Sequence, residues 1–276
     1  MMMSGPRGDW NGVRADLARH SVALLHARLD DWRPEGAGGP RLRALLGRDW
    51  SRFLDLTHHD VRTRFAASRV LLKYAAAAAL DVRPQAVELG YTPTGRPYLL
   101  GYDGVQISLS HTEDLLLVGL ATSGTIGVDA ERGDRELYGP GLARHLCTPR
   151  EVELVEALPA EERDPALVRL WTLKEAYSKA IGLGMQFSFT DFGFETDHSV
   201  TGVRRPDGTP GTGTEWAFHT YYLDGPFTIS VAVGDAGFGV TEDTQAGTML
   251  DAGIVDALTE ALGDDDLGPP EDDERW

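Results

Sequence analysis

Two acidic residues, Asp129 and Glu131, lie one residue apart at the end of the apolar segment 125–131. In an extended strand, residues i and i+2 project from the same face, so these carboxylates would converge while the apolar residues are buried. Converging carboxylates repel each other unless a cation lies between them, and a hard divalent ion such as Mg²⁺ meets this need. Hydrated acids at a strand end, or ion pairs with Arg132 and Arg135, account for the same pattern, so the pair alone leaves both interpretations open.

A second pair of charged residues lies in segment 165–181, whose apolar periodicity predicts a helix. Glu175 and Lys179 are four residues apart and therefore share one face of that helix. The pair could be a metal ligand with a cation for phosphate one turn away, or it could be an ordinary surface ion pair.

Two short segments have residue types that suit phosphate. Gly95, Arg96 and Pro97 lie in a turn where the backbone can approach a ligand closely and a guanidinium can bind phosphate, although an ordinary hairpin turn is the better explanation of this segment alone. Segment 108–111, SLSH, ends a predicted strand with two hydroxyls on one side and the imidazole of His111, and a polar strand end is the alternative. Further cations in the preceding predicted helix are Arg62, Arg64 and Arg69.

Composition limits the classes of protein that these residues can serve. The formal net charge of the 276-residue chain is -17, which argues against a nucleic-acid partner because phosphate neutralisation needs a basic face. No run of 18 apolar residues and no secretory signal is evident, so we expect a cytoplasmic protein that does not enter membranes. The single cysteine, Cys147, excludes an internal disulfide framework and is expected to be a buried structural residue.

The order of expected elements predicts an α+β fold with two pseudo-symmetric lobes, each with helices packed on a mostly antiparallel sheet. Expected boundaries are 1–40 for a partly helical or flexible N-terminal segment, 41–132 and 133–240 for the lobes, and 241–276 for an acidic, mostly disordered tail. Ser123 and Gly124 are expected to form a hairpin turn between two strands. Helices are expected at 13–32, 41–53, 61–80, 148–158, 165–181 and 251–262, and strands at 86–91, 97–100, 105–110, 115–121, 125–131, 216–222 and 227–233, with apolar alternation also at 187–194.

Four segments together resemble a known family. In order, GRPY, SLSH, GVDAE and WTLKEAYSKAIGLG are similar to the signature of the 4′-phosphopantetheinyl transferase superfamily, over about residues 62–194. The resemblance is to the surfactin-synthetase-type branch, in which one chain holds two pseudo-symmetric halves. It implies Mg²⁺-dependent transfer of 4′-phosphopantetheine from coenzyme A to a serine of an apo acyl carrier or peptidyl carrier domain, with release of 3′,5′-ADP. It also implies a monomer with an internal pseudo-twofold axis.

The resemblance assigns roles to individual residues. Asp129, Glu131 and Glu175 would bind Mg²⁺, for which Mn²⁺ could substitute, together with the coenzyme A pyrophosphate. Lys179 would bind phosphate and assist the leaving group, and Glu175 is our choice for the general base. Arg96 stands where the family often has lysine, and Ala130 where it often has a bulkier residue. The remaining predicted coenzyme A contacts are Arg64, Gly95, Arg96, Pro97, Ser108, Leu109, Ser110, His111, Asp129 and Lys174.

Two other classes of protein compete with this interpretation. A metal-dependent nuclease would use an acid and a D/E-x-K element, but here the order is Lys174–Glu175 on a predicted helix and the chain is acidic. A non-enzymatic acidic adaptor would pair its carboxylates with arginines and would not bind coenzyme A. Because the chain is acidic, a carrier domain would dock through apolar contacts and a local basic rim rather than by long-range attraction.

Overall fold

The structure, a computed structural model, describes residues 1–34, 38–138, 142–183, 188–195, 200, 202–223 and 226–234. The acidic tail and the helix expected at 251–262 lie outside the described residues. The described part is mixed α and β with antiparallel sheets, as the sequence predicts. Its helices are α1 (Asn11–His20), η1 (Leu29–Trp32), α2 (Pro40–Leu46), η2 (Gly47–Asp49), α3 (Trp50–Asp55), α4 (His59–Leu80), η3 (Pro84–Ala86), α5 (Leu142–Leu146), α6 (Pro149–Glu156) and α7 (Ala160–Ile181). Its strands are β1 (Val22–Arg28), β2 (Leu89–Tyr91), β3 (Pro97–Leu99), β4 (Gln106–Thr112), β5 (Leu115–Ala121), β6 (Thr125–Arg132), β7 (Trp216–Leu223) and β8 (Phe227–Gly234).

The first large sheet has the strand order β1-β5-β4, with both pairs antiparallel. Helix α4 packs on this sheet, and its buried apolar residues share one core cluster with residues of β1, β4 and β5. Trp32 and Val13, from the N-terminal part of the chain, belong to the same cluster. The first forty residues therefore contribute both a strand and core side chains to this half of the molecule.

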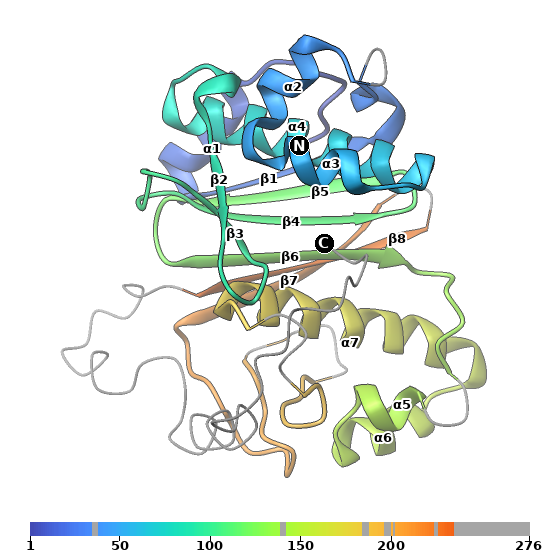
Figure 1. The fold of residues 1–276 in the computed structure, drawn as a ribbon. Helices are drawn as coiled ribbons and strands as arrows, with labels where there is room; N and C mark the ends of the chain where they lie inside the picture. Colours follow the sequence, from blue (N-terminus) through green and yellow to red (C-terminus); the bar gives the residue numbers. More distant parts are fainter. Residues whose placement is uncertain are drawn as a thin grey trace, which may run out of the picture.

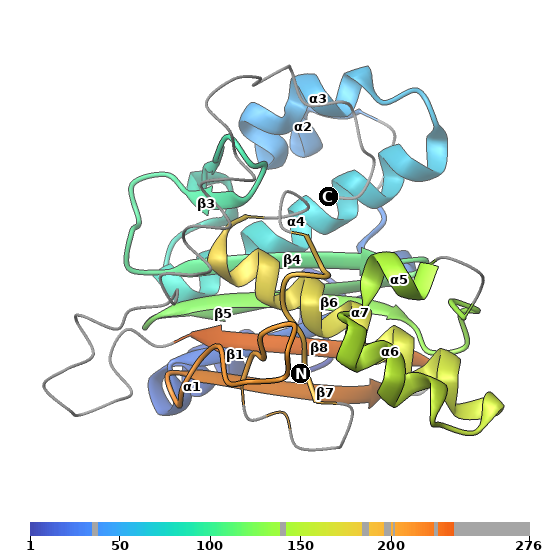
Figure 2. The ribbon, with the colours of Figure 1, turned by 90° about the horizontal axis from the view of Figure 1, so that it is seen from below.

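The second large sheet has the order β6-β8-β7, again antiparallel. Helix α7 packs directly on it, and Gly127 allows this close approach because a Cβ there would lie 1.8 Å from the carbonyl oxygen of Ala176. Figures 1 and 2 show the two sheets in the middle of the molecule, with α4 on one outer side and α7, α5 and α6 on the other. Each half thus has a strand, a 22-residue helix and an antiparallel pair of strands in that order.

The helix expected at 13–32 is wrong beyond its first half. Helix α1 ends at His20 because Ser21 adopts a left-handed conformation with φ 58°, and the next seven residues form β1. Leu24 and Leu25 therefore point to opposite faces of a strand, and Leu25 alone is fully buried. The spacing of the leucines in this segment suits a helix, but the pairing of β1 with β5 outweighs it, because tertiary contacts readily override local propensity.

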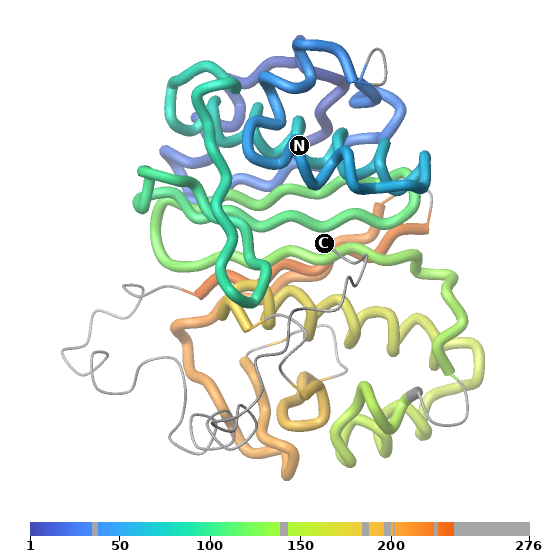
Figure 3. The backbone as a smooth tube through the Cα atoms, in the orientation of Figure 1, coloured from blue at the N-terminus to red at the C-terminus, as the bar shows by residue number. Residues whose placement is uncertain are grey.

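The hairpin expected at Ser123–Gly124 is also wrong. Among the described strands, β5 pairs with β1 and β4, whereas β6 pairs with β8. The turn instead carries the chain from one sheet to the other, as the backbone trace in Figure 3 shows. The segment expected to alternate at 187–194 contains turns and one isolated bridge, from Gly193 to Arg204, among its described residues.

Candidate active site

The two sheets meet along β4 and β6, where side-chain hydroxyls connect strands that are not hydrogen-bonded neighbours in either described sheet. Ser108, Ser110 and Thr112 alternate along β4 and therefore share one face. The hydroxyl of Ser108 accepts a hydrogen bond from the backbone N–H of Val128 at 3.0 Å. We call this contact line between β4 and β6, with the acids on β6, the seam.

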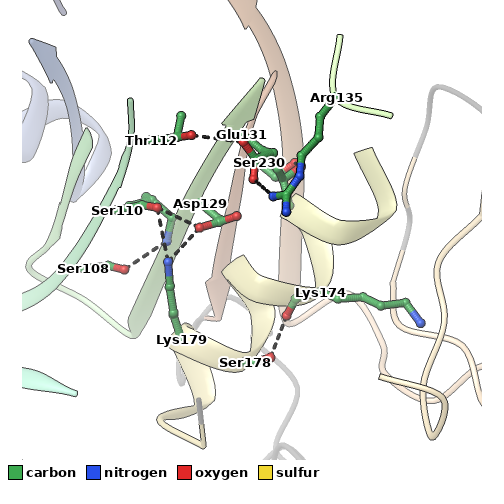
Figure 4. Close-up of polar contacts among 12 residues, drawn as sticks. Ser108, Ser110, Thr112, Asp129, Glu131, Arg135, Lys174, Ser178, Lys179 and Ser230 are labelled. Atoms are coloured by element: carbon green, nitrogen blue, oxygen red, sulfur yellow. Dashed lines mark hydrogen bonds and ion pairs between the residues drawn. The ribbon is translucent and has the colours of Figure 1, made fainter. Parts of the chain in front are cut away.

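Asp129 and Lys179 form a buried ion pair at the seam (Figure 4). Lys179 Nζ lies 2.7 Å from Asp129 Oδ1 and 3.3 Å from Ser110 Oγ, and Ser110 Oγ donates to the same carboxylate oxygen at 2.7 Å. Asp129 is 5% exposed and Lys179 8% exposed. Burial raises the pKa of the Asp129 carboxyl, and the Lys179 ammonium and the Ser110 hydroxyl oppose that rise.

Glu131 lies further along the same face of β6 and has its own set of partners. Thr112 Oγ1 donates to Glu131 Oε1 at 3.0 Å, and the backbone N–H of Arg132 donates to the same oxygen at 2.8 Å. Arg135 forms an ion pair with Glu131 Oε2. Each of the two acids on β6 therefore has a cationic partner, but only the Glu131–Arg135 pair is one that the ion-pair alternative predicts, because Asp129 pairs with Lys179.

Glu175 is 8% exposed and lies one turn before Lys179 on α7. Thr172, one turn earlier still, places its hydroxyl 2.8 Å from that of Ser230, and Ser230 is the strand partner of Asp129. The helix positions on both sides of Glu175 thus contact the Asp129–Ser230 pair. Within the described residues, however, no group of three or more His, Cys, Asp or Glu side chains is arranged to hold a metal ion. The structure does not show the predicted three-carboxylate metal group.

The β2–β3 hairpin brings the predicted phosphate turn to the end of α7. Gly95 has φ 82°, which its glycine character permits, and Thr94 Oγ1 donates to the carbonyl oxygen of Gly182 at 2.7 Å. Burial lowers the pKa of the Arg96 guanidinium from its ordinary value. A small cavity at this junction is lined by Thr94, Arg96, Pro97, Ile107, Ser108, Leu109, Lys179 and Gly182.

The charges of three cationic side chains act on His111. Burial, followed by the nearby charges of Arg69, Arg64 and Lys179, lowers the pKa of His111 to about 4. Arg69 is 1% exposed and donates from Nε to the hydroxyl of Tyr91 at 3.1 Å. The family resemblance predicts coenzyme A contacts for Arg64 and His111, whereas the sequence marks Arg69 only as one of the cations of its helix. An arginine inside the apolar stripe of a helix is the signal that could have identified it.

Lys174 does not lie at the seam, and this position corrects the prediction that Lys174 contacts coenzyme A. It is 0% exposed, lies 2.7 Å from Glu151 Oε2, and also donates to the carbonyl oxygens of Phe189 and Phe192. Five residues separate it from Lys179, which places the two side chains about 140° apart around the helix. Figure 4 shows Lys174 pointing away from the Asp129–Lys179 pair.

A Lys174→Met variant is expected to lower the free energy of unfolding by about 3–5 kcal/mol, because Glu151 would remain buried without its cation. Urea denaturation measures this loss, and an Arg150→Met variant, which breaks an exposed pair with Glu153, is the control and should change stability by less than about 1 kcal/mol. Unchanged stability together with a raised KM for coenzyme A would instead indicate that Lys174 binds a phosphate of coenzyme A.

Several other residues have structural roles. Glu151 completes a capping box at the start of α6, in which Thr148 accepts from the Glu151 N–H and donates its own N–H to the Glu151 carboxylate. Cys147 is buried, and burial raises its pKa to about 12, so the thiol is protonated and unsuited to nucleophilic attack. No helix in the described ranges combines the length and the apolar character needed to cross a bilayer.

Comparisons with known proteins agree on one family. A model of the 4′-phosphopantetheinyl transferase superfamily matches residues 125–232, which include β6, α7, β7 and most of β8. A phosphopantetheinyl transferase of Thraustochytrium sp. is 30% identical over 227 residues, which cover 77% of this chain and 78% of the relative. The 4′-phosphopantetheinyl transferase HetI of Nostoc sp. is 36% identical over 129 residues, or 45% of this chain and 54% of the relative. The chain thus spans about half the length of HetI, and 51% of a similar relative from Synechocystis sp..

Proposed function

The chain belongs to the 4′-phosphopantetheinyl transferase superfamily, and we propose that it transfers 4′-phosphopantetheine from coenzyme A to a carrier-protein serine. The observation that carries this proposal is the buried Asp129–Lys179 pair at the seam, with His111 and the charges of Arg64 and Arg69 on the other side of β4. A carboxylate and several cations within one buried region suit a substrate with several phosphates. We further propose that the acceptor is an apo acyl carrier or peptidyl carrier domain and that 3′,5′-ADP is released.

The cations define a binding direction for the donor. Arg64 and His111 lie on the α4 side of the seam and would hold the 3′-phosphate of coenzyme A, with the charge of the buried Arg69, which pairs with Asp49, behind them. Arg96 and Lys179 line the cavity beside the β2–β3 hairpin and would hold the pyrophosphate. Guanidinium groups suit this task because they bind phosphate oxygens in pairs.

We propose that Asp129, Glu131 and Glu175 hold Mg²⁺ when coenzyme A is bound. The donor chemistry fits, because all three side chains are carboxylates, which Mg²⁺ prefers, and two of them share one face of β6. When bound, Mg²⁺ supplies positive charge that neutralises the pyrophosphate oxygens. For Asp129 to accept the ion, Lys179 would turn from this carboxylate toward a substrate phosphate.

The chain's own residues would carry out the proton and charge movements. The carrier serine oxygen attacks the phosphorus bonded to the pantetheine oxygen, and the bond from that phosphorus to the bridging oxygen breaks. Glu175 would accept the serine proton, and the ammonium of Lys179 would stabilise the charge that develops on the leaving 3′,5′-ADP. The low exposure of Lys179 strengthens this stabilisation, because water screens it poorly.

The arrangement of the halves supports the finer family assignment. Both large sheets place the first strand of their half beside the last, and each half has one 22-residue helix between them. We therefore propose that the chain is a member of the surfactin-synthetase-type branch and acts as a monomer with an internal pseudo-twofold axis.

His111 should make recognition of the 3′-phosphate depend on pH. Its pKa is lowered to about 4 in the free protein, and a bound phosphate should raise this pKa because the anion stabilises the imidazolium. The preference for coenzyme A over 3′-dephospho-coenzyme A should therefore increase as pH falls from about 7.5 to about 5. Calorimetry measures this preference as a ratio of Kd values for the protein and for a His111→Gln variant. The difference between the two proteins is free of the titration of the phosphate itself, because that titration affects both equally. Equal pH dependence in both proteins would exclude the proposed contact.

The transfer itself is tested with apo carrier domains from fatty-acid, polyketide and nonribosomal-peptide pathways. The protein is incubated with each carrier, coenzyme A and Mg²⁺, and the carrier mass and free 3′,5′-ADP are measured together. The proposal predicts equal amounts of modified carrier and 3′,5′-ADP for at least one carrier. Absence of both products across the whole panel, with coenzyme A bound, would refute it.

A further inference from the structure

The seam contains a residue that neither the family resemblance nor the proposed mechanism uses. Thr112, the last residue of β4, donates from Oγ1 to Glu131 Oε1 across the boundary between the two sheets. Ser110 does the same for Asp129, at 2.7 Å, so two neighbouring hydroxyls on one face of β4 each aim one carboxylate of β6. We infer that Thr112 is a positioning residue for the metal site, an inference that rests on the proposed function.

The contact is specific because it fixes one oxygen of Glu131. Oε1 receives hydrogen bonds from Thr112 and from the backbone N–H of Arg132, while Oε2 pairs with Arg135. The Arg132 N–H follows Glu131 directly in the chain, and Arg135 is an exposed side chain on a later turn. Thr112 is the partner that comes from the other sheet, so it relates the Glu131 carboxylate to the strand that contains His111.

This geometry links the binding of coenzyme A to the position of the acidic side chains on β6. His111 and Thr112 are adjacent on β4, so they point to opposite faces, one toward the Arg64–Arg69 cations and the other toward Glu131. A shift of β4 on binding of the 3′-phosphate would therefore move the hydroxyl that orients Glu131. Partners of this kind, which hold a metal-binding carboxylate without touching the ion, typically change metal affinity by about 10- to 100-fold when removed.

The test measures metal binding directly as well as turnover. Electron paramagnetic resonance titration of the full chain with Mn²⁺, in the presence of coenzyme A, gives a Kd for the ion. Thr112→Val removes the hydroxyl at nearly constant volume and should weaken Mn²⁺ binding by about 10-fold or more, with a matching rise in the Mg²⁺ concentration for half-maximal rate. Thr112→Ser retains the hydroxyl and should stay within about threefold of the unaltered protein.

Glu113→Gln provides the matched control. Glu113 also crosses the seam, pairing with Arg132 Nη1 at 3.0 Å, but it does not touch a carboxylate of β6. Its loss should leave the Mn²⁺ Kd unchanged, because an exposed ion pair contributes little. Wild-type Mn²⁺ affinity in Thr112→Val, or equal weakening in Glu113→Gln, would overturn the inference. Absence of Mn²⁺ binding in the unaltered protein would instead refute the metal assignment of the proposed function.

Discussion

Replacing Asp129 by asparagine is expected to lower kcat/KM for carrier modification by roughly 10³-fold. Asparagine has nearly the same shape and can still accept the hydrogen bond from Ser110, so the change removes charge more than structure. The buried position of Asp129 makes the lost charge costly for the reaction, since neither solvent nor a neighbouring group replaces it readily. Steady-state rates with a modified-carrier readout measure the effect.

The control for this variant is Asp134→Asn. Asp134 is an exposed acid that pairs with Arg132 outside the seam, and its loss should change kcat/KM by less than about threefold. Circular dichroism of both variants should match that of the unaltered protein. An Asp129→Asn protein that keeps more than about a tenth of the activity would contradict the assignment of this carboxylate.

Replacing Lys179 by methionine is expected to have two separate effects. Activity should fall by roughly 10²-fold, because a cation beside the leaving phosphate is lost. The free energy of unfolding should fall by about 3–5 kcal/mol near neutral pH, because the Asp129 carboxylate remains buried without its counter-ion.

The stability loss should depend on pH with a defined sign. The folded-state pKa of Asp129 is already raised by burial, so its contribution to stability is largest below the ordinary carboxyl pKa and is lost as pH rises through the folded pKa. Methionine removes the charge that opposes the rise, which moves this loss to higher pH. Thermal unfolding at several pH values should therefore show the deficit growing from about pH 5 to about pH 8.

Lys179→Arg serves as the comparison, because it keeps the charge and should recover most of the stability. A Lys179→Met protein as stable as the unaltered one at pH 8 would show that the Asp129 pair is not a buried ion pair in solution.

The elements with strong apolar periodicity could be predicted from the sequence. Helices α4 and α7 and strand β5 lie close to their expected ranges, because each buries a continuous apolar face. Strand β1 could not be predicted, since a single left-handed residue, Ser21, separates it from α1, and its leucines continue a helical spacing that begins at Leu17. The pairing of β6 with β8 rather than β5 depends on contacts about a hundred residues apart, which local turn signals do not contain.

The residues of the site could be predicted only as far as their chemical types limit the reactions that they can perform. Asp129 and Lys179, for which the sequence suggests neighbouring roles, lie together as an ion pair that the sequence does not predict, and the charge of Arg64 acts on His111. The predicted coenzyme A contact of Lys174 was wrong because a position within a motif does not determine which way a helical side chain points. Thr112 was missed because a hydroxyl that orients a carboxylate has no distinctive spacing along the chain.

The most direct test of the three-carboxylate site is a crystal structure of the complex with coenzyme A and Mn²⁺, with the ion located by its anomalous scattering. The account predicts one ion coordinated by oxygens of Asp129, Glu131 and Glu175, with Lys179 turned toward a phosphate of the donor. An ion held without Glu175, or an Asp129–Lys179 contact unchanged in that complex, would contradict it.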